Sequence, residues 1–151
     1  MKELIETWEI HNRINLYLLE SLSEVSLSGT ASSKGRTVGE QFAHIHNVRL
    51  MWLKAAMPEL LAGVEKIEKE EITKKQLKEQ LTKSGKAITQ LLEHALANGK
   101  LKGFKPHPTA FMGYLIAHES HHRGQITLSL KQSNNLPDKK ILFGLWEWGV
   151  R

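Results

Sequence analysis

Hydrophobic residues recur at three- and four-residue steps in four segments of the chain, the spacing of one face of an α-helix. Between these segments lie stretches rich in serine, glycine or charged residues, such as SLSGTASSKG and EKIEKEEI, which predict connections. The four predicted helices span about residues 2–25, 37–57, 74–98 and 108–133.

Local signals define several ends of these helices. Thr37 is the residue type of an N-cap, and Glu40, three positions later, completes the spacing of a capping box. Asn98 and Gly99 are expected to end the third helix, because glycine readily adopts the left-handed conformation found there. The tail DKKILFGLWEWGVR is too short for another bundle helix, and its two tryptophans and Phe143 predict that it folds back onto the body.

Four helices of about 20–25 residues, each with one apolar stripe, are typical of a four-helix bundle. The sequence has no internal repeat and no alternating pattern of a β-sheet. We therefore predict an all-α fold in which residues 1–151 form one helical-bundle domain, with a short C-terminal extension packed on the bundle. The connection between the second and third helices is the longest, which permits a crossover instead of a simple up-and-down order.

The composition agrees with a globular chain of one domain: 151 residues, of which 40% are hydrophobic and 25% charged. No apolar run reaches the roughly 18 residues of a transmembrane helix, and the amphipathic N-terminus is unlike a signal peptide. The absence of cysteine excludes disulfides, thiolate metal sites and a cysteine nucleophile. These features predict a cytoplasmic protein without a membrane partner.

The net charge of +5 arises from one segment. Residues 73–105 hold eight lysines and two glutamates, so the rest of the chain carries a net charge of −1. This segment has no arginine and almost no interleaved aromatic residues, which readers of nucleic acid usually show. We interpret it as a solvated, lysine-rich helix face and expect no specific nucleic-acid partner.

The strongest chemical signal is AHESHHRGQI in the fourth predicted helix. His118 and His122 lie four positions apart, so on a helix they share one face and can chelate one metal ion. His121 points about 60° to the side of His118 and is an alternative ligand. Gln125, one turn beyond His121, can hydrogen-bond into the same region. The competing interpretation is a polar helix face, but the apolar neighbours place these histidines at or near the core.

A second signal is FAHIHNVRLMW in the second predicted helix. On a helical wheel, His44 lies at the edge of an apolar stripe, whereas His46 falls about 200° away and is expected to face solvent. The stripe comprises Ile45, Val48, Met51, Trp52 and Ala55. Alone, His44 would be a histidine at the edge of the core. Together with His118 and His122 it predicts a three-histidine site with open coordination positions, as in catalytic metal centres.

The segments AHIHNVRLMW and HESHHRGQI, with the opening WEIHNRINLYLLESL, resemble the DinB-like (damage-inducible, YfiT-type) family of four-helix-bundle metalloproteins. The resemblance spans nearly the whole chain. It implies that His44, His118 and His122 bind a divalent metal ion, usually assigned as zinc or nickel. The doublet of histidines at 121–122 leaves the register open, and His46 stays an outside candidate.

The resemblance also implies an activity, a thiol-dependent S-transfer to small electrophiles with a low-molecular-weight thiol such as bacillithiol, mycothiol or glutathione. Because the chain has no cysteine, the nucleophile must come from such a thiol or from water activated by the metal. A metal-dependent hydrolase is therefore one alternative. A non-catalytic metal- or small-ligand-binding bundle is the other, since it would use the same ligands.

Further expectations concern the surroundings of this site. The resemblance implies a homodimer, for which Leu50, Leu53 and the C-terminal tryptophans are possible contacts. His11 is expected at an interface or along the same cavity, and His94 and His107 near helix ends as capping or cationic groups. The candidates for lining a substrate pocket are Trp8, Arg49, Tyr114, Arg123 and Gln125.

Overall fold

The computed structural model describes all 151 residues, and its regular structure is helical. The bundle consists of four long helices, α1 (Lys2–Glu20), α2 (Val38–Ala56), α3 (Lys74–Asn98) and α4 (Pro108–Gln132). Shorter helices lie in the connections and at the C-terminus: η1 (Val25–Ser28), η2 (Pro58–Leu61), η3 (Lys69–Glu71), α5 (Lys139–Gly144) and η4 (Trp148–Val150). The all-α bundle is confirmed, although α1 ends earlier than expected. No helix has the length and hydropathy of a membrane-spanning segment.

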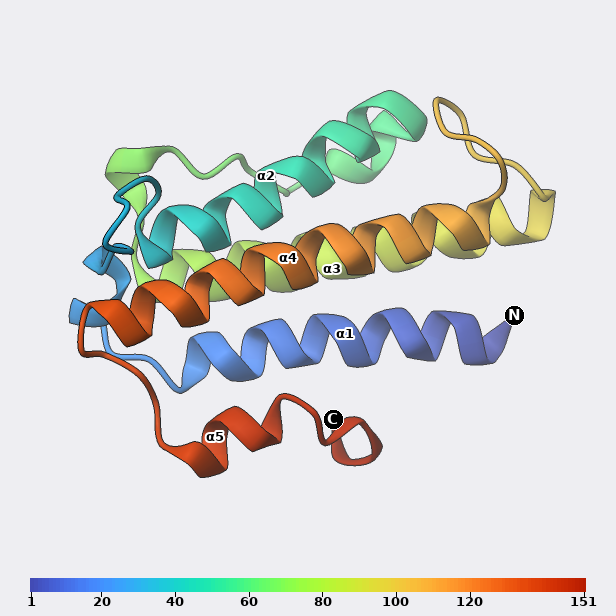
Figure 1. Ribbon diagram of the computed structural model, residues 1–151. Helices are drawn as coiled ribbons and strands as arrows, with labels where there is room; N and C mark the ends of the chain where they lie inside the picture. The colour runs from blue at the N-terminus through green and yellow to red at the C-terminus, as the bar shows by residue number, and fades with distance from the viewer.

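The long connection between α2 and α3 carries the chain back along the bundle, so these two helices run in the same direction (Figure 1). Helices α1 and α4 run in the opposite direction. Helix α1 packs mainly on α3, and α2 packs on both α3 and α4. The crossover that the sequence permits is therefore present. It makes α2 and α4 antiparallel neighbours, and this pairing decides where the histidines meet.

The ends of the helices follow their local signals. The backbone N–H of Glu40 donates to Thr37 Oγ1 (3.1 Å) and the N–H of Thr37 donates to Glu40 Oε2 (2.7 Å), so the predicted capping box is formed. At the start of α3, Thr73 Oγ1 accepts from the N–H of Gln76 (3.1 Å), and Gly99 ends that helix with a φ of 68°. His107 is the N-cap of α4, which confirms its predicted capping role.

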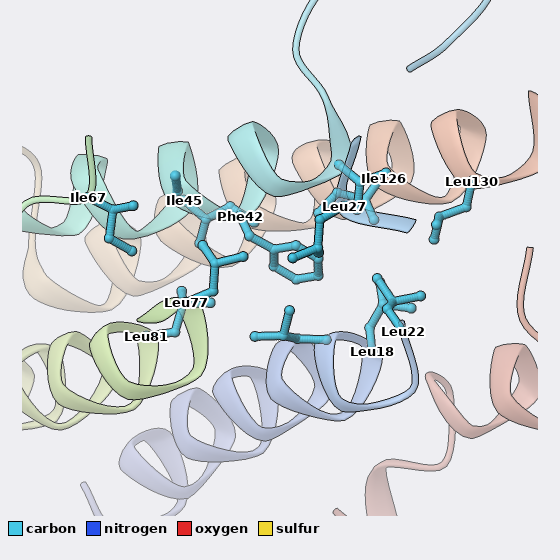
Figure 2. Packing of buried hydrophobic residues seen from close by; sticks show 13 residues of the cluster. Leu18, Leu22, Leu27, Phe42, Ile45, Ile67, Leu77, Leu81, Ile126 and Leu130 are labelled. Atoms are coloured by element: carbon cyan, nitrogen blue, oxygen red, sulfur yellow. The ribbon is translucent and has the colours of Figure 1, made fainter. Parts of the chain in front are cut away.

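Two apolar clusters fill the two ends of the bundle. The first holds thirteen buried residues, including Phe42 and Ile126, and draws on all four long helices (Figure 2). The second holds eleven buried residues, including Trp8, Leu53 and Phe111. Each fully buried side chain of this size contributes roughly 1.5–3 kcal/mol to stability, so the clusters supply most of the driving force for folding.

Between the two clusters, polar side chains from all four long helices form a buried layer. This polar layer comprises His11 and Asn15 of α1, His46 and Arg49 of α2, Ser84 of α3 and Glu119 of α4. Buried polar groups lower stability unless they are hydrogen-bonded, so their partners determine whether the layer is tolerated.

The C-terminal segment returns to α1, as predicted, and of its aromatic residues only Trp148 is partly buried. The guanidinium of Arg151 lies 3.8 Å from the centre of the Tyr17 ring, and Arg13 Nη2 donates to the backbone oxygen of Arg151 (3.1 Å). Trp146 is 80% exposed and Phe143 68% exposed. Phe143 and Trp146 are therefore not the residues that hold the tail on the bundle.

Candidate metal centre

Three histidines meet at the interface of α2 and α4. His44 comes from α2, and His118 and His122 come from consecutive turns of α4. One ring nitrogen of each lies within 4.8 Å of those of the other two. The ring centres of His44 and His122 are 4.4 Å apart, and those of His118 and His122 are 4.6 Å apart. The structure therefore brings together the three residues that the sequence singled out.

This cluster lies at the rim of the bundle, where solvent reaches it. His44 and His118 are half-buried and His122 is buried. His122 lies on the buried face of α4, whereas His44 projects from the side of α2 that borders α4. The cluster is thus accessible to a small molecule from outside.

Two glutamines hold the ring of His122 in place. Nδ1 of His122 lies 2.8 Å from Gln41 Oε1 and 3.0 Å from Gln125 Oε1. Both partners are acceptors, so Nδ1 carries the proton and Nε2 keeps the lone pair that a metal needs. The prediction for Gln125 is confirmed. Gln41 was missed, although its position three residues before His44 on the same helix could have indicated it.

The surroundings keep all three imidazoles neutral. Burial is the main cause that lowers the pKa of each ring, and for His122, where the neighbouring histidines add to it, the pKa falls to about 4. Metal ligands must be deprotonated, so this environment favours ligation at neutral pH.

The donor set fits a divalent cation. Nδ1 of His118 is buried without a hydrogen-bond partner, so that ring is not engaged by other protein groups at this atom. Three neutral imidazole nitrogens are ligands that zinc and nickel accept readily. His44, His118 and His122 are therefore the residues that can hold a metal ion here.

His46 does not face solvent, and this expectation was wrong. The ring is buried, with Nε2 donating to the backbone oxygen of Glu65 (2.7 Å) and Nδ1 accepting from Ser84 Oγ (3.0 Å). Burial lowers its pKa to about 4, so it is neutral. With both ring nitrogens occupied, His46 is no candidate for the metal.

The other histidines lie outside the cluster. His121 is exposed. Its ring centre lies 5.1 Å from that of His122, but its ring nitrogens are not part of the cluster of three histidines. His11 is fully buried, and its Nε2 lies 2.8 Å from Glu119 Oε2. His94 is exposed near the end of α3.

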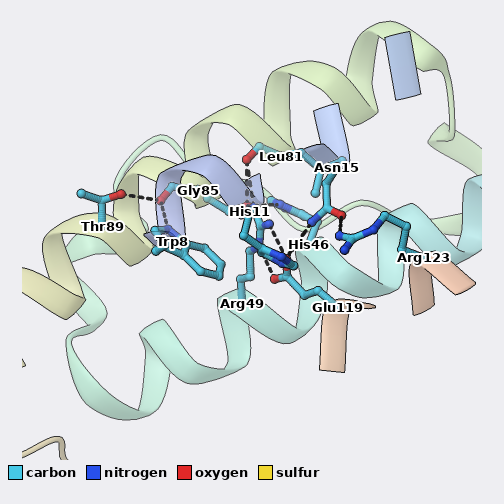
Figure 3. A network of polar contacts seen from close by, with 11 residues as sticks. Trp8, His11, Asn15, His46, Arg49, Leu81, Gly85, Thr89, Glu119 and Arg123 are labelled. Carbon is cyan, nitrogen blue, oxygen red and sulfur yellow. Dashed lines mark hydrogen bonds and ion pairs between the residues drawn. The ribbon is translucent and has the colours of Figure 1, made fainter. Parts of the chain in front are cut away.

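Glu119, next to His118, is fully engaged within the polar layer (Figure 3). Arg49 donates to both carboxylate oxygens at 2.6 and 2.7 Å, and Asn15 donates to Oε2 at 2.8 Å. Burial raises the pKa of Glu119, but Arg49 and the hydrogen bond from His11 outweigh it and lower the pKa to about 2. The carboxylate is therefore ionised, paired and unavailable as a metal ligand.

The pocket candidates separate into two groups. Trp8 and Arg49 are fully buried within the bundle, so they do not line a pocket. The guanidinium of Arg123 is half-buried and donates to Asn15 Oδ1 (2.7 Å) at the edge of the polar layer. Tyr114 does border the cluster, because its ring stacks on that of His118 with centres 6.1 Å apart.

The proposed dimer contacts are also changed. Leu53 is fully buried in the second apolar cluster and cannot contact another molecule, which corrects that expectation. Leu50 is half-buried. In these segments the strongly exposed apolar side chains are Met51 on α2 and Phe143, Trp146 and Val150 near the C-terminus.

A cavity of about 260 Å³ opens beside His44, between α2 and the connection to α3. On one side it is lined by residues of α2 and of the loop before it, and on the other by residues 66–69 and Ile72. A molecule in this cavity would contact the edge of the histidine cluster.

Comparison with known proteins gives a family. The model of the DinB family matches residues 1–133, a span that includes all four long helices and the three clustered histidines. No curated protein and no solved structure matches the chain. The extent of the family match, over most of the 151 residues, shows that this chain belongs to the DinB family.

Proposed function

We propose that this protein is a divalent-metal-dependent enzyme that transfers a small thiol to an electrophilic small molecule. The observation that carries the proposal is the group of three neutral imidazoles at the accessible rim of the bundle. Three protein ligands leave coordination positions open for substrate, whereas structural sites usually supply four. The accessible rim favours exchange of small molecules.

The chain's own residues would divide the work. His44, His118 and His122 hold the ion, and Gln41 and Gln125 orient His122. A divalent ion bound there supplies positive charge that stabilises the thiolate form of a nearby thiol. The protein has no cysteine, so the sulfur belongs to a cosubstrate.

The proposed reaction joins the sulfur of a thiol to an electrophilic carbon. A new S–C bond forms with the sulfur lone pair, and the bond from that carbon to its leaving group breaks with its electron pair on the leaving group. The thiol proton passes to solvent. No oxidant or reductant is needed, because the step is a nucleophilic substitution without net transfer of electrons to or from another reagent.

The test is a turnover assay on untagged protein loaded with zinc or nickel. Bacillithiol or glutathione is mixed with 1-chloro-2,4-dinitrobenzene, and thioether formation is followed by absorbance. The wild-type rate should exceed that of the same concentration of free ion. His118→Ala should lose both the metal and the rate, because a ligand is removed. His121→Ala is the matched control and should keep both.

The outcomes separate the alternatives. Metal binding without turnover across several thiols and classes of electrophile would favour a non-catalytic binding bundle. Turnover of an ester without added thiol, lost in His118→Ala, would favour the hydrolase. Protein that binds no zinc or nickel would contradict all of these metal-based functions.

A further inference from the structure

The cavity beside His44 borders the histidine cluster. It lies between α2 and the connection that leads to α3, and its volume is about 260 Å³. This is below the roughly 300–1,000 Å³ of pockets for drug-sized ligands, so it suits a smaller molecule. Its charged lining residues are Arg36, Glu40, Lys66, Glu68 and Lys69.

One of the three cations in this lining has no partner. Lys66 Nζ pairs with Glu68 Oε1 at 2.8 Å, and Lys69 Nζ pairs with Glu40 Oε1 at 3.0 Å. The guanidinium of Arg36 makes neither an ion pair nor a hydrogen bond with another residue. The two lysines and the two glutamates balance each other, so the lining carries one net positive charge, which comes from Arg36.

The remaining wall offers little else that could recognise a ligand. The side-chain amide of Asn47 is used twice, since Nδ2 donates to the oxygen of Ile67 (2.9 Å) and Oδ1 accepts from its N–H (3.0 Å). Ala43, Ile67 and Ile72 provide apolar surface. Among the charged side chains of the lining, Arg36 is the one without an ion pair, and the ring of His44 makes no hydrogen bond.

The loop that carries Arg36 is tied to the bundle. The N–H of Val38 donates to the oxygen of Gly29 (2.9 Å), and the N–H of Ser32 donates to Gln132 Oε1 at the end of α4 (2.7 Å). Arg36 and His44 line the same cavity, so the charge of Arg36 lies beside the histidine cluster.

We propose that Arg36 binds the carboxylate of the small molecule on which the metal centre acts, an inference that rests on the proposed function. The guanidinium presents a planar fork of donors that matches a carboxylate. A single net positive charge favours a monoanion, since Glu40 and Glu68 would repel a phosphate dianion. The substrate class is thus a carboxylate compound whose other end reaches the histidine cluster.

The experiment measures binding instead of turnover, with cobalt-loaded protein and its visible absorption spectrum. One pair of probes is 3-mercaptopropionate and the neutral 2-mercaptoethanol. The other pair is imidazole-4-acetate and the neutral 4-methylimidazole, which needs no thiol. For each pair, the ratio of the two Kd values is compared between the wild type and Arg36→Gln. The preference for the carboxylate probe should fall about five-fold in Arg36→Gln, as expected for an accessible charge-assisted hydrogen bond.

Two controls define the result. Arg36→Lys keeps the charge without the fork and should retain part of the preference. Lys34→Gln removes one positive charge from the same loop but outside the cavity lining, and it should behave as wild type. The preference should also decline with added salt, because Arg36 is exposed.

The two pairs of probes separate this inference from the proposed function. If neither thiol perturbs the cobalt spectrum but imidazole-4-acetate shows the dependence on Arg36, the carboxylate site stands and the thiol chemistry fails. If the probes bind and the ratios are the same in the wild type and Arg36→Gln, the carboxylate site is wrong. An equal loss in Lys34→Gln would overturn it as well, since a general field and not a site would then be responsible.

Discussion

Gln41 acts on the candidate metal centre through one hydrogen bond. It is buried, and its Oε1 accepts from Nδ1 of His122 at 2.8 Å. That contact fixes both the tautomer and the orientation of the ring, so that Nε2 faces the other two histidines with its lone pair. A residue of this kind changes metal affinity without touching the ion.

Gln41→Leu is expected to weaken binding of zinc or nickel about ten-fold, the lower end of the range for groups that orient a ligating histidine. The loss is limited because Gln125 still accepts from His122 at 3.0 Å. Competition with a chromogenic chelator measures the affinity. Gln125→Leu removes the longer bond alone and should have a smaller effect, and unchanged affinity in both variants would contradict this role.

The buried ion pair of Glu119 and Arg49 contributes to the stability of the fold. Arg49 contacts both carboxylate oxygens in the centre of the bundle, and neither side chain reaches solvent. Removing one partner leaves a buried charge without compensation. The loss of stability is then much larger than the net stabilisation that the intact pair provides.

Arg49→Met should therefore lower the free energy of unfolding by about 3–5 kcal/mol. Urea denaturation followed by circular dichroism measures the loss. The double variant Arg49→Met, Glu119→Leu removes both charges and should recover part of it, limited by His11 and Asn15, which lose their acceptor. A double variant less stable than the single one would show that the charges are not the dominant cause.

Helix α2 shows how far periodicity alone determines an element. Its start at Thr37 was predicted because capping depends on residues three positions apart. The hydrophobic pattern did not predict which face of α2 is buried, since apolar Met51 is 68% exposed while polar His46 and Arg49 are fully buried. A hydrophobicity wheel assigns polar residues to the surface and cannot anticipate that Arg49 meets Glu119, 70 positions away.

The capping box of α2 gives a pH-dependent contribution to stability. The hydrogen bond from the backbone N–H of Thr37, and then the ammonium of Lys69, lower the pKa of Glu40 below its ordinary value of 4.5. A carboxylate with a lower pKa in the folded state stabilises that state above pH 4.5, and this contribution is lost as the pH falls through the folded pKa.

Glu40→Ala should lower the free energy of unfolding by about 1 kcal/mol at pH 7, because the backbone N–H of Thr37 loses its acceptor. The difference from wild type should be smaller at pH 3 than at pH 7, because the contribution of the ionised Glu40 is lost as the pH falls through its lowered pKa. Urea denaturation at the two pH values tests this. Glu40→Gln keeps an acceptor for Thr37 without the charge, so its deficit at pH 7 should be smaller.

At the scale of the whole molecule, the crossover makes α2 and α4 antiparallel neighbours and thereby assembles the histidine cluster. The sequence allowed the three histidines to be selected, because His118 and His122 share a helix face and His44 was the best remaining candidate. The position of the cluster at the rim depends on the packing of α2, and so does the cavity that adds Arg36 to its surroundings. The position of the cluster and the cavity both arise from tertiary contacts, which local sequence patterns cannot predict.

A metal ion held by His44, His118 and His122 would tie α2 to α4, so the stability of the whole bundle should depend on it. Binding to the folded state alone, at a free ion concentration about 100 times the Kd, stabilises by about 2.7 kcal/mol. In a chain of this size that corresponds to roughly 5–10 °C in Tm. EDTA should therefore lower the Tm of metal-loaded protein by this amount in a thermal scan.

The same scan separates the contribution of the metal from that of the core. The triple variant His44→Ala, His118→Ala, His122→Ala should show no change in Tm on addition of EDTA, because it has no site left. Wild-type protein in EDTA should stay helical at 25 °C, since the thirteen-residue and eleven-residue apolar clusters lie on either side of the polar layer and do not need the ion. Complete loss of helical circular dichroism on chelation would show that the metal, and not the two clusters, holds the four helices together.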